Sequence, residues 1–148
     1  MMLVEHILDA ARKRLAILTR DSLVSSAAEI LINPDTPLAV VCDSEGIAVG
    51  VISRTDLVKV LADARVDACN RSAETIMSPC LFSCQAGQSL QEVWENMNTR
   101  SLRCAPVLDN EGRPQGILHA RDLAKALLEE VTNEEALLRD YVMGVGYQ

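Results

Sequence analysis

Two seven-residue stretches decide the fold of this chain: GVISRTD at residues 50–56 and GILHARD at residues 116–122. Each begins with a glycine, continues with two apolar residues and a polar one, and ends with an aspartate. They lie 66 positions apart (116 − 50 = 66), and the same offset aligns Val41 with Val107 and Leu61 with Leu127. Further upstream the offset becomes 67, which places a one-residue difference in a loop. This self-similarity indicates a tandem duplication of one structural unit.

Each copy has the pattern β-α-β-β-α. In the first copy we expect an extended segment at 15–18, a helix over 23–31 that stops at Asn33-Pro34, and a hairpin of strands 38–42 and 47–52 around a turn at 43–46. A second helix follows. Its apolar face is expected to comprise Leu57, Val60, Leu61, Ala64 and Ala68.

The second copy repeats this order with strands at 80–84, 105–108 and 116–119 and with helices over 90–97 and from residue 121 or 122. The residues Thr132 to Glu135 have capping-box spacing, which predicts a separate short helix that ends at Gly144 and Gly146. We therefore divide the chain into a first repeat at 1–69, a second repeat at 70–131, and a C-terminal helix and tail at 132–148.

A β-α-β-β-α unit of this size leaves one face of its sheet uncovered. We expect the two repeats to pack through these faces, in an α+β fold with pseudo-twofold symmetry. Such packing leaves two related clefts between the repeats, each beside strand ends and a helix start.

Composition excludes several function classes. The net charge of −7 repels phosphate backbones, and 3% aromatic residues leave little to stack on bases, so nucleic acid is not an expected partner. The five cysteines form no CxxC pair, which favours reduced thiols in the core of a cytoplasmic protein and no metal site. No apolar run is long enough for membrane insertion. Two histidines and the lack of GxSxG, P-loop or HExxH motifs argue against an enzyme.

The two stretches resemble the CBS-domain signature G-h-h-(S/T)-x-x-(D/N), where h is apolar. The sequence APVLD at 105–109 resembles the h-P-V-h-D strand of the same family. Two copies in this order resemble a CBS pair, or Bateman module. The resemblance implies a stand-alone regulatory module that binds an adenosine-containing ligand such as AMP, ADP, ATP, S-adenosylmethionine or NAD between the repeats. It also implies a homodimer that acts on an unknown partner protein and requires no cofactor.

The resemblance further implies roles for individual residues. Asp56 and Asp122 would hold the ribose hydroxyls, since one carboxylate can accept hydrogen bonds from two neighbouring hydroxyls. The remaining candidates are Ser53, Thr55 and His119 for ribose or phosphate, Ala39, Val40, Ala105, Pro106 and Val107 beside the adenine, and Arg54, Arg121 and the run Arg12 to Arg14 for phosphate. His119 departs from the usual Ser or Thr, and the strand at 38–42 lacks the family's proline.

Structural readings of the same residues stay open. Ser53 and Asp56 have the spacing of a helix capping box, whereas His119 is expected to be a poor cap for Asp122, whose charge would still favour the helix dipole. Arg54 and Arg121 fit a solvated surface equally well, and the run Arg12 to Arg14 fits one better. The chain as a whole could be a structural or protein-interaction module with no physiological nucleotide. Residues 129–147 offer either a dimer surface or a tail folded back on its own domain.

Overall fold

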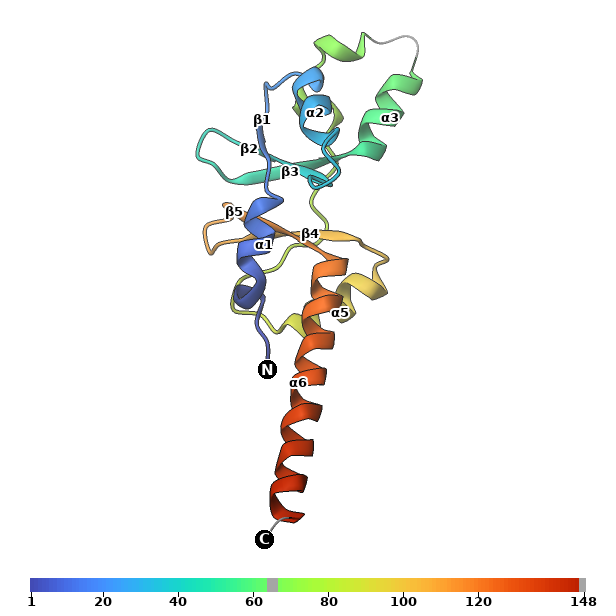
Figure 1. Cartoon of the computed structure of the whole chain (residues 1–148). Helices are drawn as coiled ribbons and strands as arrows, with labels where there is room; N and C mark the ends of the chain where they lie inside the picture. The colour runs from blue at the N-terminus through green and yellow to red at the C-terminus, as the bar shows by residue number, and fades with distance from the viewer. Residues whose placement is uncertain (64–66, 147–148) are drawn as a thin grey trace.

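A computed structural model of the chain describes residues 1–63 and 67–146 (Figure 1). The first half contains a three-stranded sheet in which β1 (Ile17–Thr19) runs parallel to β2 (Leu38–Cys42), and β2 runs antiparallel to β3 (Ala48–Ser53). The helices α2 (Val24–Leu31) and α3 (Arg54–Ala62) cover the face of this sheet that points away from the second half.

The second half repeats the hairpin with β4 (Cys104–Leu108) and β5 (Pro114–His119), preceded by α5 (Leu90–Thr99) and followed by α6 (Ala120–Gly146). Leu38 lies opposite Ser53 just as Cys104 lies opposite His119, and both ladders shift register at the equivalent residues Val41 and Val107. Gly46 and Gly112 close the two turns with φ of +82° and +88°, a conformation that favours glycine. The predicted duplication and α+β fold are confirmed.

The strand predicted at 80–84 is wrong except at one residue. In the first half, the Val40 N–H donates to the Ala16 carbonyl at 2.9 Å and extends the parallel ladder. Pro106 takes the equivalent place in the second half and has no N–H to donate. Pairing is therefore reduced to an isolated bridge between Cys84 and Val107, and the Phe82 carbonyl accepts a hydrogen bond from the Cys80 thiol instead.

Each of the two hydrophobic cores includes residues from the other half of the sequence. Val4, Leu8 and Ala11 belong to η1 (Val4–Ile7) and α1 (Leu8–Lys13), yet they pack in the core of the second half with residues such as Leu123. The core of the first half takes in Ala73 from α4 (Ala73–Ile76), which follows the short η2 (Ala68–Asn70). Each core therefore contains residues from both sides of the predicted division near residue 70. The division itself stays a prediction.

A third, smaller cluster lies between the sheets. Val40, Cys42 and Ile117 are buried together there, so the repeats pack through their sheets as expected.

The cysteines differ in their surroundings. Burial raises the pKa of the Cys84 thiol to about 12, which keeps it protonated. Cys69, in contrast, is exposed, so the expectation that every cysteine fills the core is wrong.

Two helix predictions are corrected. The expected apolar face of α3 is wrong at Leu61, which is 70% exposed, because α3 ends at Ala62 and Val60 is its last buried residue. Ala64 lies outside the described residues, and Ala68 belongs to η2.

The separate helix expected at Thr132 is part of α6, which runs unbroken from Ala120 to Gly146. The Thr132 hydroxyl donates to the Leu128 carbonyl at 2.9 Å, inside the helix, rather than capping a new one. Every residue from Val131 to Met143 is exposed, so this part of the tail does not fold back on its own domain. Of the described helices, none has both the length and the hydropathy to cross a membrane.

Candidate functional site

The first cleft lies at the start of α3 and is formed by both halves. It has a volume of about 330 Å³. Its lining consists of Leu38, Val51, Ser53, Thr55, Asp56 and Lys59 from the first half, Ser78, Pro79, Cys80, Leu81 and Phe82 from the linking segment, and Leu102, Cys104 and Pro106 from the second half. We call this the Asp56 cleft. Most of its walls are apolar, and Lys59 is the cation in its lining.

Asp56 is 9% exposed and is held by hydroxyl and backbone donors. Its Oδ2 accepts from the Ser53 N–H at 2.9 Å and from the Ser53 hydroxyl at 3.2 Å, while its Oδ1 accepts from the Ser78 hydroxyl at 2.8 Å. The Ser53 Oγ in turn accepts from the Asp56 N–H, which completes the capping box. Asp56 therefore caps the helix and faces the cleft at the same time.

The second cleft lies at the start of α6 and has a volume of about 380 Å³. It is lined by Ala10, Lys13, Arg14, Asn33, Asp35 and Asp122. We call this the Asp122 cleft. It is related to the first by the duplication, but its side chains differ because α1 replaces the linking segment as one wall. Charged side chains dominate its lining.

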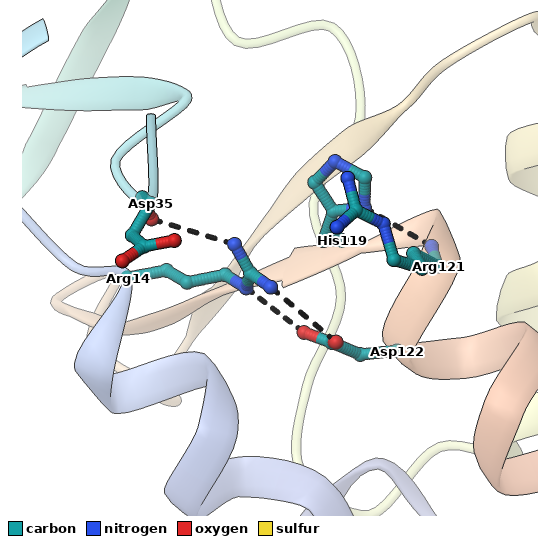
Figure 2. Close-up of polar contacts among 5 residues, drawn as sticks. All are labelled: Arg14, Asp35, His119, Arg121 and Asp122. Atoms are coloured by element: carbon teal, nitrogen blue, oxygen red, sulfur yellow. Dashed lines mark hydrogen bonds and ion pairs between the residues drawn. The ribbon is translucent and has the colours of Figure 1, made fainter. Parts of the chain in front are cut away.

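Arg14 occupies the carboxylate of this second cleft. Its Nε donates to Asp122 Oδ2 at 2.9 Å and its Nη2 donates to Oδ1 at 3.4 Å, a two-point contact visible in Figure 2. Its Nη1 donates to the Asp35 carbonyl at 3.4 Å. The Arg14 and Asp122 side chains are 18% and 22% exposed, so water screens this ion pair only weakly. Of the run Arg12 to Arg14, the last two residues line the cleft and Arg12 pairs with the exposed Asp9.

His119 caps α6, contrary to the expectation that it would be a poor cap. Its Nδ1 accepts from the Arg121 N–H at 3.0 Å (Figure 2), which requires the neutral ring. Partial burial, and then the nearby charges of Arg14 and Arg121, lower the pKa of His119 and favour that form. The Arg121 residue is exposed, and neither it nor His119 lines a described cleft.

Arg54 is an anchor for the loop after α2. Its Nε donates to the Leu31 carbonyl at 2.8 Å, and its Nη2 donates to the Asn33 and Thr36 carbonyls at 2.8 and 3.3 Å. The first bond satisfies a carbonyl at the end of α2, and the other two hold the loop that follows it. A role for Arg54 toward phosphate stays a prediction and would require it to leave these partners.

The residues predicted beside the adenine are mainly core residues. Ala39, Val40, Ala105 and Val107 are fully buried, side chain and backbone alike, so a place beside the adenine stays a prediction for them. Pro106 is the one of the five that lines the Asp56 cleft.

Sequence reasoning missed Ser78, Lys59 and Phe82 in the Asp56 cleft and Asp35 in the Asp122 cleft. Ser78 reaches its place because its backbone pairs with Val51 in both directions, at 2.8 and 2.9 Å. No local pattern in the sequence marks this pairing. For metals, no group of three or more potential His, Cys, Asp or Glu ligands occurs within residues 1–63 and 67–146.

Comparison with known proteins agrees with this geometry. The CBS domain model matches residues 4–63 and 73–129. A curated relative from Acidianus ambivalens, an uncharacterized 17.7 kDa protein, is 28% identical over 107 residues. That match covers 72% of this chain and 63% of the relative, so the chain spans less than two thirds of its length.

Three solved structures share the fold. The CBS-domain protein ATU1752 from Agrobacterium tumefaciens superposes with a TM-score of 0.70 at 28% identity, over 84% of this chain and 98% of its own. CBSX2, solved in complex with AMP, superposes with a TM-score of 0.74 at 22% identity, over 87% of this chain and 98% of its own. The CBS pair of MJ0100, solved with methylthioadenosine and S-adenosylmethionine, superposes with a TM-score of 0.72 at 23% identity. This match covers 88% of this chain and 98% of that one. With two family matches that cover most of its residues and the doubled signature behind them, the chain belongs to the CBS-domain family.

Proposed function

We propose that this protein is a regulatory module that binds an adenosine-containing ligand in the clefts between its halves and acts on a partner protein without catalysing a reaction. The observation that supports this most is the placement of Asp56 and Asp122, which occupy equivalent positions of the duplication and line separate clefts. The complexes of CBSX2 with AMP and of MJ0100 with methylthioadenosine and S-adenosylmethionine support the same ligand class.

The Asp56 cleft suits an adenosine compound of low charge. The two ribose hydroxyls would replace the Ser53 and Ser78 hydroxyls as donors to Asp56, while the Ser53 N–H keeps its bond to the carboxylate. The apolar walls, which include Phe82 and Pro106, would cover the purine. Exchanging one set of hydroxyl donors for another leaves the buried carboxylate satisfied.

The Asp122 cleft suits a phosphorylated nucleotide. Here Arg14 and Lys13 are the cations in the lining, and a guanidinium forms strong two-point bonds with phosphate oxygens. Ribose binding to Asp122 would release Arg14, which could then turn to the phosphate. AMP, ADP and ATP are therefore the proposed ligands of this cleft.

A ligand could transmit a signal because its cleft is formed by both halves of the protein. The Asp56 cleft draws on the first half, the linking segment and the second half, so a ligand there contacts all three. Binding would favour one relative orientation of the halves, and a homodimer or an unknown partner protein would respond to that orientation.

Isothermal titration calorimetry with adenosine, AMP, ADP, ATP, S-adenosylmethionine and NAD tests this function. A ligand present at about 100 times its Kd should also raise the unfolding free energy by about 2.7 kcal/mol. Asp56→Asn and Asp122→Asn should each remove binding at one cleft. Asp140→Asn, at an exposed position of α6, is the matched control and should change neither.

Two outcomes would reject the proposal. If none of these compounds binds, the chain is an interaction module without a nucleotide. If binding survives both Asp56→Asn and Asp122→Asn, the ligand sits elsewhere. The melting temperature of each variant without ligand separates lost binding from lost folding.

A further inference from the structure

The C-terminal part of α6 extends beyond the body of the protein (Figure 1). Every residue from Val131 to Met143 is exposed, a stretch that is roughly 20 Å long at the rise of an α-helix. A helical segment of this length is marginally stable in water when nothing packs against it. A surface that covers one of its faces would therefore stabilise it.

An apolar stripe runs along this part of α6. Leu128, Val131, Leu138 and Val142 are 67%, 51%, 66% and 61% exposed. Their spacing places Leu128 and Val142 at the a positions of a heptad repeat and Val131 and Leu138 at the d positions, so the four share one face. At the base of the helix, Leu123 and Ala126 pack into the core of the protein. The stripe thus leaves the body where that packing ends.

The charges beside the stripe fit a second copy of the same helix. In this heptad register Glu134 takes a g position and Arg139 the following e position. In a parallel helix pair, a g residue lies beside the e residue five positions later on the other helix. Two parallel copies would therefore form two Glu134–Arg139 pairs related by the twofold axis.

One residue of the seam opposes this pairing. Glu135 falls at the a position between Leu128 and Val142, where it would face its own counterpart. The two Glu135 carboxylates repel each other, so the two helices should associate more weakly than their apolar residues alone would predict.

We propose that two copies of this chain associate through a parallel pairing of α6, along Leu128, Val131, Leu138 and Val142, with each Glu134 beside Arg139 of the partner subunit. The pairing places both pairs of ligand clefts at the same end of the assembly. It does not depend on nucleotide binding, so it stands or falls separately from the proposed function.

Sedimentation equilibrium of the full chain without ligand tests the apolar seam. The unmodified chain should form a dimer, and Leu138→Glu should weaken the dimer by at least about ten-fold. Asn133→Glu introduces the same charge at an exposed f position, on the opposite face of α6, and should leave the dimer unchanged. Glu135→Leu should tighten the dimer, because it replaces the repulsive pair with an apolar contact.

Exchanging the two charged residues tests whether the partner of α6 is a second copy of this chain. Arg139→Glu and Glu134→Arg should each weaken the dimer by about five-fold, because each replaces attraction with repulsion twice in the assembly. The double variant should restore the original affinity. Only a second copy of this chain can give that rescue, since a different partner would not carry the exchanged residue.

Cross-linking tests the direction of the helices. In a Cys69→Ser background, which removes the exposed native thiol, Val142→Cys should form an intermolecular disulfide under mild oxidation. Asn133→Cys, on the opposite face, should not form one. Far-UV circular dichroism checks that each variant keeps its helices. A monomeric unmodified chain, a dimer that tolerates Leu138→Glu, a double variant without rescue, or a Val142→Cys chain that fails to cross-link would each overturn the proposal.

Discussion

The guanidinium of Arg14 donates to both carboxylate oxygens of Asp122, which lies 108 positions later in the chain. The contact joins the end of α1 to the start of α6, and both side chains are largely shielded from water. It gives the signature aspartate of the second repeat an ion-pair partner where Asp56 has hydroxyl donors. The pair thus stabilises the fold and sets the chemistry of the cleft.

Arg14→Met should lower the unfolding free energy by about 1–3 kcal/mol, because it leaves Asp122 without its charged partner. Asp122→Asn should have a smaller effect of the same sign. In the double variant the losses should fall short of their sum by on the order of 1 kcal/mol, as expected for residues in direct contact. Urea denaturation measures all three. Arg12→Met removes the exposed Arg12–Asp9 pair and should change stability by less than about 0.5 kcal/mol. Strictly additive losses would contradict the pairing.

Gly116→Ala should destabilise the protein more than Gly50→Ala. A Cβ at Gly116 would lie 2.8 Å from the backbone carbonyl carbon and the Cβ of Ala11, so α1 would have to move off the sheet. A Cβ at Gly50 would mainly meet the Met77 side chain, at 2.5 Å, and that side chain can change rotamer.

We expect Gly116→Ala to cost about 1–3 kcal/mol, the range for overpacked cores, and Gly50→Ala to cost less. Thermal and chemical denaturation of the two variants give the comparison. Gly87→Ala is the control, because a Cβ there has no heavy atom within 4 Å. If Gly50→Ala proves the more damaging, the close approach of α1 to β5 is not what requires the second glycine.

Stability should fall as the pH drops below about 6.5, and His119 should contribute to that fall. Partial burial, followed by the charges of Arg14, Arg121 and Arg103, lowers the pKa of His119 in the folded chain, although Asp122 opposes them. The unfolded chain therefore takes up this proton first as the pH decreases. The stabilising contribution of the neutral ring is present above the unfolded pKa and is lost as the pH falls through it toward the lower folded value.

His119→Ser tests this dependence, since serine can accept the same N-terminal hydrogen bond but does not titrate in this range. The variant should lose less unfolding free energy than the unmodified chain between pH 7.5 and pH 5.5. Denaturant titrations at the two pH values measure the difference. Equal losses in both proteins would show that His119 does not govern this part of the pH profile.

Local sequence patterns were sufficient for the hairpins and for the placement of the signature aspartates at helix starts. Strand 38–42 was predicted with its observed bounds, and the turns after Asp43 and Asp109 follow the expected compositions. Each of these features depends on residues within a few positions of one another. The same reasoning failed at Thr132, where capping-box spacing occurs inside a helix that simply continues. It also failed at 80–84, where Pro106, 22 positions beyond Cys84, limits the pairing.

The sequence by itself determined the duplication, the family signature and the order of strands and helices, because alternation, helical periodicity and turn chemistry act over short stretches of chain. The tertiary structure alone decided that α1 packs in the core of the second half, that Ser78 and Arg14 bind the two aspartates, and that α6 leaves the body with an exposed stripe. Those contacts join residues far apart in the chain, and they form only when the two sheets pack face to face. The backbone of Ala11 can approach the second sheet because Gly116 has no side chain there.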